Sequence, residues 1–312
     1  VTTNTVGADR QDGLMADTRL RLGITYVPYL PPEQLHDLAQ AAEESGLDDL
    51  WVWEGCFKQS GIASASAALA WTSPIRVGIG LMPVPLRNVA LTAMEIATLC
   101  QLFPGRVLPG IGHGVQPWME QVGGKVTSPL TLLREHATAL QILLAGEEVS
   151  VQGRYVHLDQ VQLDWPPVVA PPLAMGGEGP RSVALAGELA DAYLFAAARS
   201  ETEIATAYEI LSQAWRQRGI DPASRPEVVL ALITATGPGA RARVDAEIPF
   251  WFKEPDPSIG SAGDAEHIAA DLRRLADLGV TTVAVQPTRD EPDLLGLVEF
   301  LGREVKPLLG SR

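Results

Sequence analysis

Short apolar runs alternate with longer amphipathic stretches along almost the whole chain after residue 19. Eight runs have the length and the flanking turn residues of buried strands, and they cover residues 20–26, 49–53, 75–82, 106–112, 173–175, 191–195, 227–236 and 280–285. The stretches between them repeat apolar residues at helical spacing. The clearest begins at Pro129 and continues through Leu133, Ala137 and Leu140. Strands that alternate with helices in this way pair in parallel, with the helices outside.

Eight strand–helix units in 312 residues fit a (β/α)8 barrel, or TIM barrel, of the α/β class better than an open sheet. We predict one barrel domain over residues 19–312, with insertions after strand four and before strand five. The second insertion, residues 147–165, reads as a hairpin. Residues 1–18 are polar, and we expect a disordered tail there. In such a barrel the active site lies at the carboxyl ends of the strands.

One glycine-rich turn joins the fifth predicted strand to the helix that follows it. We expect Gly176, Gly177 and Gly179 to permit positive φ angles and the close approach of a ligand. Pro180 suits the first helical position, and Arg181 adds a positive charge. A helix N-terminus after such a turn suits a phosphate group. A tight turn without any ligand predicts the same glycines, so the pattern alone leaves both interpretations open.

His113 lies between two glycines, Gly112 and Gly114, at the end of the fourth predicted strand. Histidine titrates near neutral pH, so a side chain at this place could bond a coenzyme or give a proton to a substrate. A histidine with a structural role in the turn is the alternative. His113 is our first candidate for a catalytic residue.

Further candidates follow strands two and four. Glu54 could act as an acid, a base or a salt-bridge partner. Trp53 and Trp118 are candidates for the walls of a substrate pocket, with core packing as the alternative for Trp53, and Gln116 is a candidate contact at its rim. His36, His136 and His267 fall within predicted helices, where we expect them to face solvent, and no pair of histidines makes a metal site.

The composition limits the partners of the protein. The formal net charge is −14, which argues against nucleic acid or an anionic membrane as the main partner. The two cysteines, Cys56 and Cys100, have no metal-ligand spacing. No apolar run is long enough to span a membrane, and the first residues lack the pattern of a signal peptide. We therefore expect a cytoplasmic protein that acts on a small molecule.

Several segments in this order resemble the luciferase-like superfamily of flavin-dependent oxidoreductases. The resemblance covers nearly the whole chain after residue 19, and its pieces lie at residues 46–52, 76–83, 87–88, 105–112, 133–135 and 153–155. It implies a flavin-type cofactor, and the barrels of this superfamily often form homodimers. It also implies a non-prolyl cis peptide within residues 79–81 that bows against the ring, which makes Ile79, Gly80 and Leu81 cofactor-binding candidates.

The turn at residues 176–181 resembles the branch that uses the deazaflavin coenzyme F420, such as methylenetetrahydromethanopterin reductase and F420-dependent dehydrogenases. In that branch Gly-Pro-Lys or Gly-Pro-Arg opens the helix whose N-terminus holds the phosphate of the coenzyme. The resemblance implies cofactor-binding roles for a set of residues in two turns: Gly112, His113, Gly176, Gly177, Glu178, Gly179, Pro180 and Arg181.

The chain departs from the F420-dependent glucose-6-phosphate dehydrogenases at their acid–base positions. Gly55 or Cys56 stands near the place of their histidine, and Val115 stands at the place of their glutamate. We therefore expect the protein to act on a different organic substrate, which is unidentified. The reaction would transfer a hydride between this substrate and F420. An FMN-dependent monooxygenase of the same superfamily and a non-catalytic flavin-binding protein are the alternatives.

Overall fold

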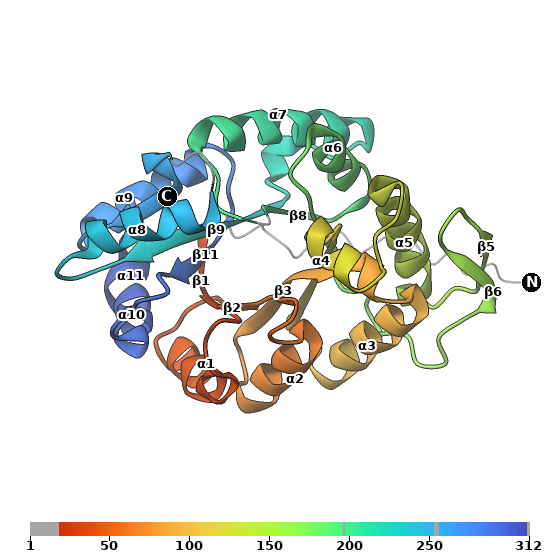
Figure 1. The fold of residues 1–312 in the computed structure, drawn as a ribbon, viewed down its shortest axis with the longest axis horizontal. Coiled ribbons are helices and arrows are strands. Elements are labelled where there is room, and N and C mark those ends of the chain that lie inside the picture. The colour runs from red at the N-terminus through yellow and green to blue at the C-terminus, as the bar shows by residue number, and fades with distance from the viewer. Residues whose placement is uncertain (1–18, 196, 253–255, 311–312) are drawn as a thin grey trace, which may run out of the picture.

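The computed structural model describes residues 19–195, 197–252 and 256–310. The predicted disordered tail, residues 1–18, lies outside the described residues. Eight described strands close into a parallel barrel, which Figure 1 shows nearly end-on. They are β1 (Arg21–Tyr26), β2 (Asp49–Val52), β3 (Arg76–Pro83), β4 (Val107–Gly112), β7 (Ala174–Gly176), β8 (Ala192–Phe195), β9 (Glu227–Ala235) and β11 (Thr282–Pro287).

Each of these strands pairs with the next in parallel, and β11 pairs with both β9 and β1, which closes the ring. Every strand overlaps one of the eight apolar runs, so the predicted (β/α)8 barrel is confirmed. The short strand β10 (Gly260–Ala262) adds to the outer part of β9. It was not predicted, because three residues are too few to show the alternation or the apolar run that distinguishes a strand from a loop.

Helices surround the barrel, and all of them except the short α11 bury apolar residues. They are α1 (Leu35–Glu44), α2 (Gly61–Trp71), α3 (Val89–Leu102), α5 (Pro129–Leu144), α6 (Pro180–Leu189), α7 (Glu201–Gln217), α8 (Ala240–Trp251), α9 (Ala265–Asp277), α10 (Leu294–Phe300) and α11 (Lys306–Leu308). A π-helical turn, Leu301–Val305, links the last two. The sequence suggested an irregular segment from Pro249, but α8 continues to Trp251 with Pro249 inside it.

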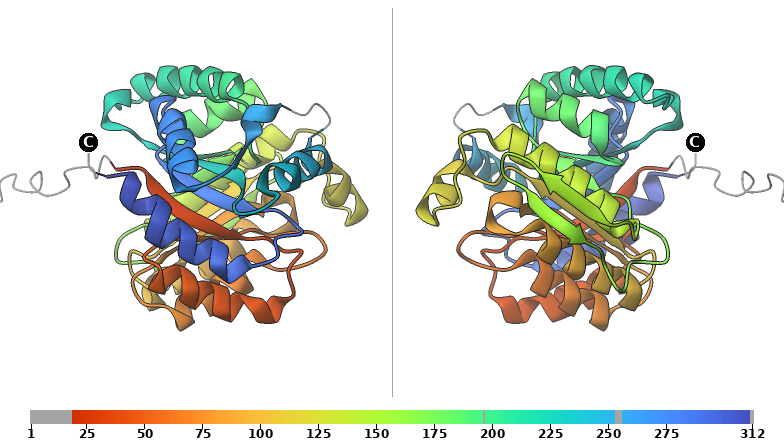
Figure 2. Two further views of the ribbon diagram at one scale, coloured as in Figure 1. Left: turned by 90° about the vertical axis from the view of Figure 1, so that its left-hand side faces the viewer. Right: turned by 90° about the vertical axis from the view of Figure 1, so that its right-hand side faces the viewer.

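Two insertions stand where they were predicted. The short helix α4 (Gln116–Gln121) follows β4. The antiparallel hairpin of β5 (Val149–Gln152) and β6 (His157–Val161) precedes β7, and Figure 2 shows it on the outside of the barrel. The backbone N–H groups of residues 154–156, between the two strands, donate to the carboxylate of Glu135 on α5. This contact fixes the hairpin against the outer layer.

A charged network closes the amino-terminal end of the barrel. Asp49, which is 0% exposed, accepts hydrogen bonds from Arg21 and Arg76, and Arg76 continues to Glu227 on the far side at 2.6 Å. Burial alone would raise the pKa of Asp49, but the two guanidinium groups hold it below its usual value. The opposite end, at the carboxyl ends of the strands, remains open for a site.

No helix in the described part of the chain is long and apolar enough to cross a membrane. Within the same residues, no group of three or more His, Cys, Asp and Glu side chains is arranged to hold a metal ion.

Candidate cofactor and substrate site

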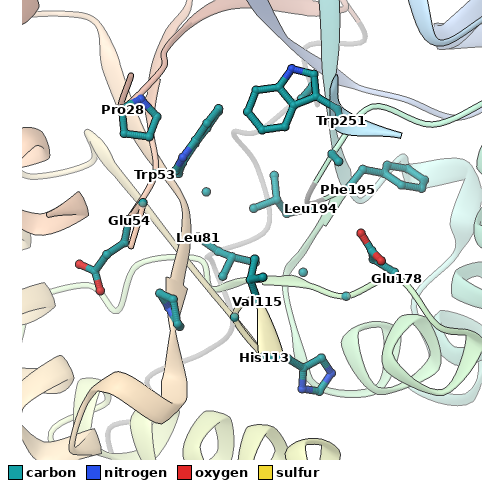
Figure 3. Close-up of a pocket in the computed structure, with 18 of the residues that line it drawn as sticks. Pro28, Trp53, Glu54, Leu81, His113, Val115, Glu178, Leu194, Phe195 and Trp251 are labelled. Atoms are coloured by element: carbon teal, nitrogen blue, oxygen red, sulfur yellow. The ribbon is translucent and has the colours of Figure 1, made fainter. Parts of the chain in front are cut away.

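A cavity of about 710 Å³ opens at the carboxyl ends of the barrel strands. Its lining divides into two parts, which we name by their composition. The glycine half comes from the segments after β4, β7 and β8, and includes His113, Ser182 and residues 176–179. The aromatic half comes from the segments after β1 and β2 and from the end of α8, and includes Tyr29, Trp53, Trp251 and Phe252. Figure 3 shows the two halves facing each other across Leu81 and Leu194.

At Gly176 and Gly177 the glycine half needs glycine because of close packing, and not because of backbone angles. The prediction of positive φ at Gly176, Gly177 and Gly179 is wrong: none of the three has one. A Cβ on Gly176 would lie 2.6 Å from Leu81 Cδ2, and one on Gly177 would lie 2.5 Å from Ser182 Cβ. Both distances are too short for real side chains, so Gly176 lets strand β7 lie close to Leu81 on β3, and Gly177 lets the turn lie close to helix α6.

The start of α6 is open where a ligand phosphate was predicted. Gly179 is the N-cap, with an ordinary φ of −81°, and Pro180 occupies the first turn. Apart from its two chain neighbours, no atom of the described residues lies within 4 Å of a Cβ placed on Gly179. Arg181 is exposed and does not line the cavity. The nearby charged pair is instead Glu178 with the mostly buried Arg199, at 2.5 Å.

His113 connects the end of β4 to this turn. Its Nε2 atom forms a 2.8 Å hydrogen bond with Ser182 Oγ on α6, and its Nδ1 atom is buried without a hydrogen-bond partner among the described residues. Burial lowers the pKa of His113, and the backbone of Pro129 acts in the opposite direction. Both His113 and Ser182 line the cavity, so a hydrogen-bonded imidazole and hydroxyl stand side by side there.

Strand β3 bulges where it passes under the cavity. Its register against β4 shifts between Ile79 and Met82, and glycines inside a strand are common at such bulges. The peptide between Gly80 and Leu81 is cis, within the three residues that the resemblance named. Gly80 and Leu81 line the cavity, whereas Ile79 is fully buried and packs in the core outside it.

Glu54 lines the aromatic half, but its carboxylate is already bound. Arg87 donates to it at 2.5 Å, and the Gly61 backbone N–H donates at 3.2 Å. In Figure 3 the carboxylate points away from the centre of the cavity.

His136, expected to face solvent, is 1% exposed. Its burial and the charge of Arg87 lower its pKa to about 4, so the prediction of a solvent-facing histidine is wrong here: α5 is covered on that face.

Aromatic side chains from distant segments form the wall of the other half. The rings of Trp53 and Trp251 meet edge to face, with 6.3 Å between centroids, and Tyr29 meets Trp251 at 5.7 Å. Trp251 Nε1 donates to Glu247 at 2.6 Å, and Arg289 also donates to that carboxylate. These contacts hold Trp251 against both the other rings of the wall and the carboxylate of Glu247.

Most of the predicted site residues come together around the cavity. Those that line it are Trp53, Glu54, Gly80, Leu81, His113, Gln116, Trp118, Gly176, Gly177, Glu178 and Gly179. Those that do not are Ile79, Gly112, Pro180 and Arg181. Gly112 instead packs directly behind it, because a Cβ there would lie 2.5 Å from Leu81 Cδ2. Trp118 and Gln116 are on α4, and Gln116 donates to the carbonyl of His113 at 3.2 Å.

Sequence reasoning missed several lining residues. Ser182 has no motif of its own and is noticed only through its bond to His113. Trp251 and Phe252 lie in a segment that read as irregular, although two adjacent aromatic residues at a helix end were an available signal. Thr25 and Trp51 lie inside predicted strands, where alternation could have shown which side chains point into the barrel. Gln286 comes directly after the predicted strand 280–285, because β11 continues to Pro287.

The residues present fit a cofactor that has a flat ring and a phosphate group. Open space beside Gly179 lies at the N-terminus of α6, where backbone N–H groups favour an anion. Leu81, on the bulge, offers an apolar surface next to it. These features fit the class of cofactor-binding (β/α)8 barrel enzymes.

Comparison with known proteins agrees with this class. The sequence profile of the family "luciferase-like monooxygenase" matches residues 12–277, and the chain belongs to that family. It is 28% identical over 234 residues to a 5,10-methylenetetrahydromethanopterin reductase of Methanolobus tindarius, with 75% of this chain and 71% of that protein aligned. It is 31% identical over 207 residues to an F420-dependent glucose-6-phosphate dehydrogenase of Kineococcus radiotolerans, which covers 60% of this chain and 61% of that protein.

Solved structures show the same barrel. The F420-dependent tetrahydromethanopterin reductase of Methanopyrus kandleri superposes with a TM-score of 0.84 at 21% identity, covering 94% of this chain and all of that one (100%). An F420-dependent secondary alcohol dehydrogenase in complex with an F420–acetone adduct gives 0.83 at 22% identity, covering 94% and 99%.

Proposed function

We propose that the protein is an oxidoreductase that transfers a hydride between coenzyme F420 and a small organic substrate. The observation that carries the proposal is the glycine half of the cavity, where the turn at residues 176–179 leads into the open N-terminus of α6. The names of the relatives support F420 over other cofactors, since the two described above are an F420-dependent dehydrogenase and a reductase whose solved counterpart is F420-dependent.

The bound coenzyme would supply the hydride chemistry, and the chain would bind, orient and shield it. The Gly179 backbone and the N-terminus of α6 would hold the phosphate. Gly176 and Gly177 keep the loop close to Leu81, which would support the ring. His113 and Ser182, hydrogen-bonded at 2.8 Å, would give one proton to the substrate when it is reduced and take one back when it is oxidised.

We propose His113, and not Glu54, as the residue that handles the proton. Its carboxylate accepts from Arg87 and from the Gly61 backbone, and a role as acid or base requires that this pair be broken. The contacts of Glu54 agree with a structural role instead. It would hold the segment after β2, which carries Trp53 into the cavity.

An FMN-dependent monooxygenase is the second candidate, since the family carries that description. Binding titrations with F420 and FMN side by side, followed by coenzyme absorbance, distinguish the two. We expect F420 to bind with a Kd on the order of 1 μM or tighter and FMN at least about tenfold more weakly. Tighter binding of FMN, together with oxygen uptake after its reduction, would establish the monooxygenase instead. Binding of neither coenzyme would refute both.

A further inference from the structure

We infer that the floor of the aromatic half is a substrate subsite for an uncharged, mainly apolar molecule with one carbonyl or hydroxyl oxygen. This inference rests on the proposed function, because it assigns the aromatic half to the substrate and the glycine half to the coenzyme. It is carried by three polar side chains, Thr25, Trp51 and Gln286, which line the cavity floor.

The sheet register brings these three residues together. Thr25 on β1 pairs with Trp51 on β2. On the other side of β1, Ile24 pairs with Val285, so the next residue of β11, Gln286, lies beside Thr25. Neighbouring residues in one layer of a barrel point the same way, and all three line the cavity. They therefore form one polar patch beside the apolar inward-facing residues Leu108, Ala174, Leu194, Val229 and Ala284. The charged network of Arg21, Asp49 and Arg76 lies further toward the amino-terminal end of the barrel.

Two atoms of this patch lack partners. Thr25 and Trp51 are each 3% exposed, and their Oγ1 and Nε1 atoms have no hydrogen-bond partner among the described residues. The indole ring is held in place by close contact, since a Cβ on Gly78 would lie 2.4 Å from Trp51 Cε3. Leaving buried polar groups unpaired is unfavourable. An indole N–H only donates, and a hydroxyl and an amide can also donate, so the group that suits this patch is an acceptor oxygen.

The charges around the cavity determine that this oxygen is uncharged. The lining carboxylates, Glu54 and Glu178, are paired with Arg87 and Arg199 at 2.5 Å each. The lining lysine, Lys58, is exposed and lies over the outer Tyr29 ring at 4.4 Å. No arginine belongs to the lining among the described residues.

A phosphate or carboxylate on the substrate would lose its hydration without gaining a cation on this floor. The apolar walls of Trp53, Trp251 and Phe252 instead suit a hydrocarbon ring or chain. The site thus excludes sugar phosphates and selects an alcohol or ketone with an apolar body.

The test uses three probes of one shape: cyclohexanone, methylcyclohexane and cyclohexanecarboxylate. Each is titrated into the full chain with and without saturating F420, and followed by tryptophan fluorescence. We expect cyclohexanone to bind at least about tenfold more tightly than either of the others, since only it offers an uncharged acceptor. Equal binding of the three, or tighter binding of the carboxylate, overturns the inference.

Variants identify the atoms involved. Thr25→Val keeps the shape and removes the hydroxyl, and we expect it to weaken cyclohexanone binding about fivefold to tenfold while leaving methylcyclohexane unchanged. Thr288→Val is the matched control: Thr288 is 2% exposed and its Oγ1 also lacks a partner, but it does not line the cavity. It should change none of the three affinities. An unchanged cyclohexanone affinity in Thr25→Val overturns the inference.

The two proposals fail in different ways. If Thr25→Val weakens F420 and not cyclohexanone, the floor serves the coenzyme, which refutes the substrate subsite and leaves the proposed function standing. If F420 does not bind to the unmodified protein, the proposed function is refuted. The probes without F420 then still decide the chemistry of the floor.

Discussion

The two halves of the cavity are built in different ways. The glycine half is made by backbone segments that approach closely, so that a Cβ on Gly176 or Gly177 would meet neighbours at 2.6 Å or less. The aromatic half is made by large side chains from three distant segments, represented by Tyr29, Trp53 and Trp251, whose rings pack on one another. The first offers N–H groups and a helix terminus, and the second offers apolar surface above the polar floor of Thr25, Trp51 and Gln286.

This difference indicates which half varies with function. A backbone cradle binds a group common to many reactions, such as a phosphate, and tolerates little change. A wall of side chains can change its substrate by substitution without disturbing the barrel. The departures from the relatives' acid–base residues lie in both halves: Gly55 and Cys56 follow β2 in the aromatic half, and Val115 follows β4 in the glycine half. The comparison can be tested by substitutions that separate chemistry from binding.

The largest effect is expected at His113. His113→Ala should lower the rate of hydride transfer at saturating F420 by about 100-fold, the loss typical of a missing acid or base. Stopped-flow absorbance measures it. Because burial lowers the pKa of His113 below its ordinary 6.5, its neutral form persists as the pH falls through 6.5, and the rate in the unmodified protein should hold there.

Ser182→Ala is the control for His113, since it removes the Nε2 partner and keeps the ring. We expect a smaller loss of rate, on the order of tenfold or less. A His113→Ala variant with normal binding and normal transfer would remove His113 from the chemistry, and Glu54 would become the first candidate.

A smaller effect is expected at Gly179. Gly179→Val should weaken F420 binding about tenfold, or about 1.4 kcal/mol, because its side chain occupies the open space before α6. The melting temperature should stay the same, since φ is −81° and no protein atom is crowded. Gly177→Val is the contrast: its Cβ would meet Ser182 at 2.5 Å, so both affinity and melting temperature should fall. If Gly179→Val binds F420 normally, the phosphate lies elsewhere.

The smallest effect is expected at Arg181. Arg181→Ala should weaken F420 binding about twofold to fivefold, because an exposed charge near a helix N-terminus adds little to the N–H groups themselves. Arg216→Ala, which removes another exposed arginine on α7, controls for the change in net charge. A loss far above tenfold at Arg181 would show that this side chain contacts the coenzyme directly, and that the glycine half depends on a charge as well as on its backbone.

Much of the fold could be predicted from the sequence because its signals are local. Strand β9 is an apolar run, and α9 repeats Ile268, Leu272 and Leu275 at helical spacing, all buried in the structure. Pro180 in the first turn of α6 was also predicted correctly. Alternation of strands and helices then leaves few topologies, since crossovers between parallel strands have one hand. The barrel follows from these local patterns.

The glycine half was found for a related reason and partly misunderstood. A turn between a strand and a helix is contiguous in the chain, so residues 176–181 stood out at once. The reason for the glycines did not, because Gly176 avoids Leu81 on β3, which is distant in sequence. Arg181 and Gly112 were placed in the site by motif, and their real positions depend on how the turn packs.

What only the tertiary structure decided is the aromatic half and its floor. Trp53 and Trp251 are almost two hundred positions apart in the chain and meet because α8 ends above β2. Thr25 and Gln286 become neighbours because the barrel closes between β1 and β11. The commitment of Glu54 to Arg87 likewise depends on a contact between separate segments. A sequence specifies each element through nearby residues, whereas a pocket is formed by residues that only the packing of those elements brings together.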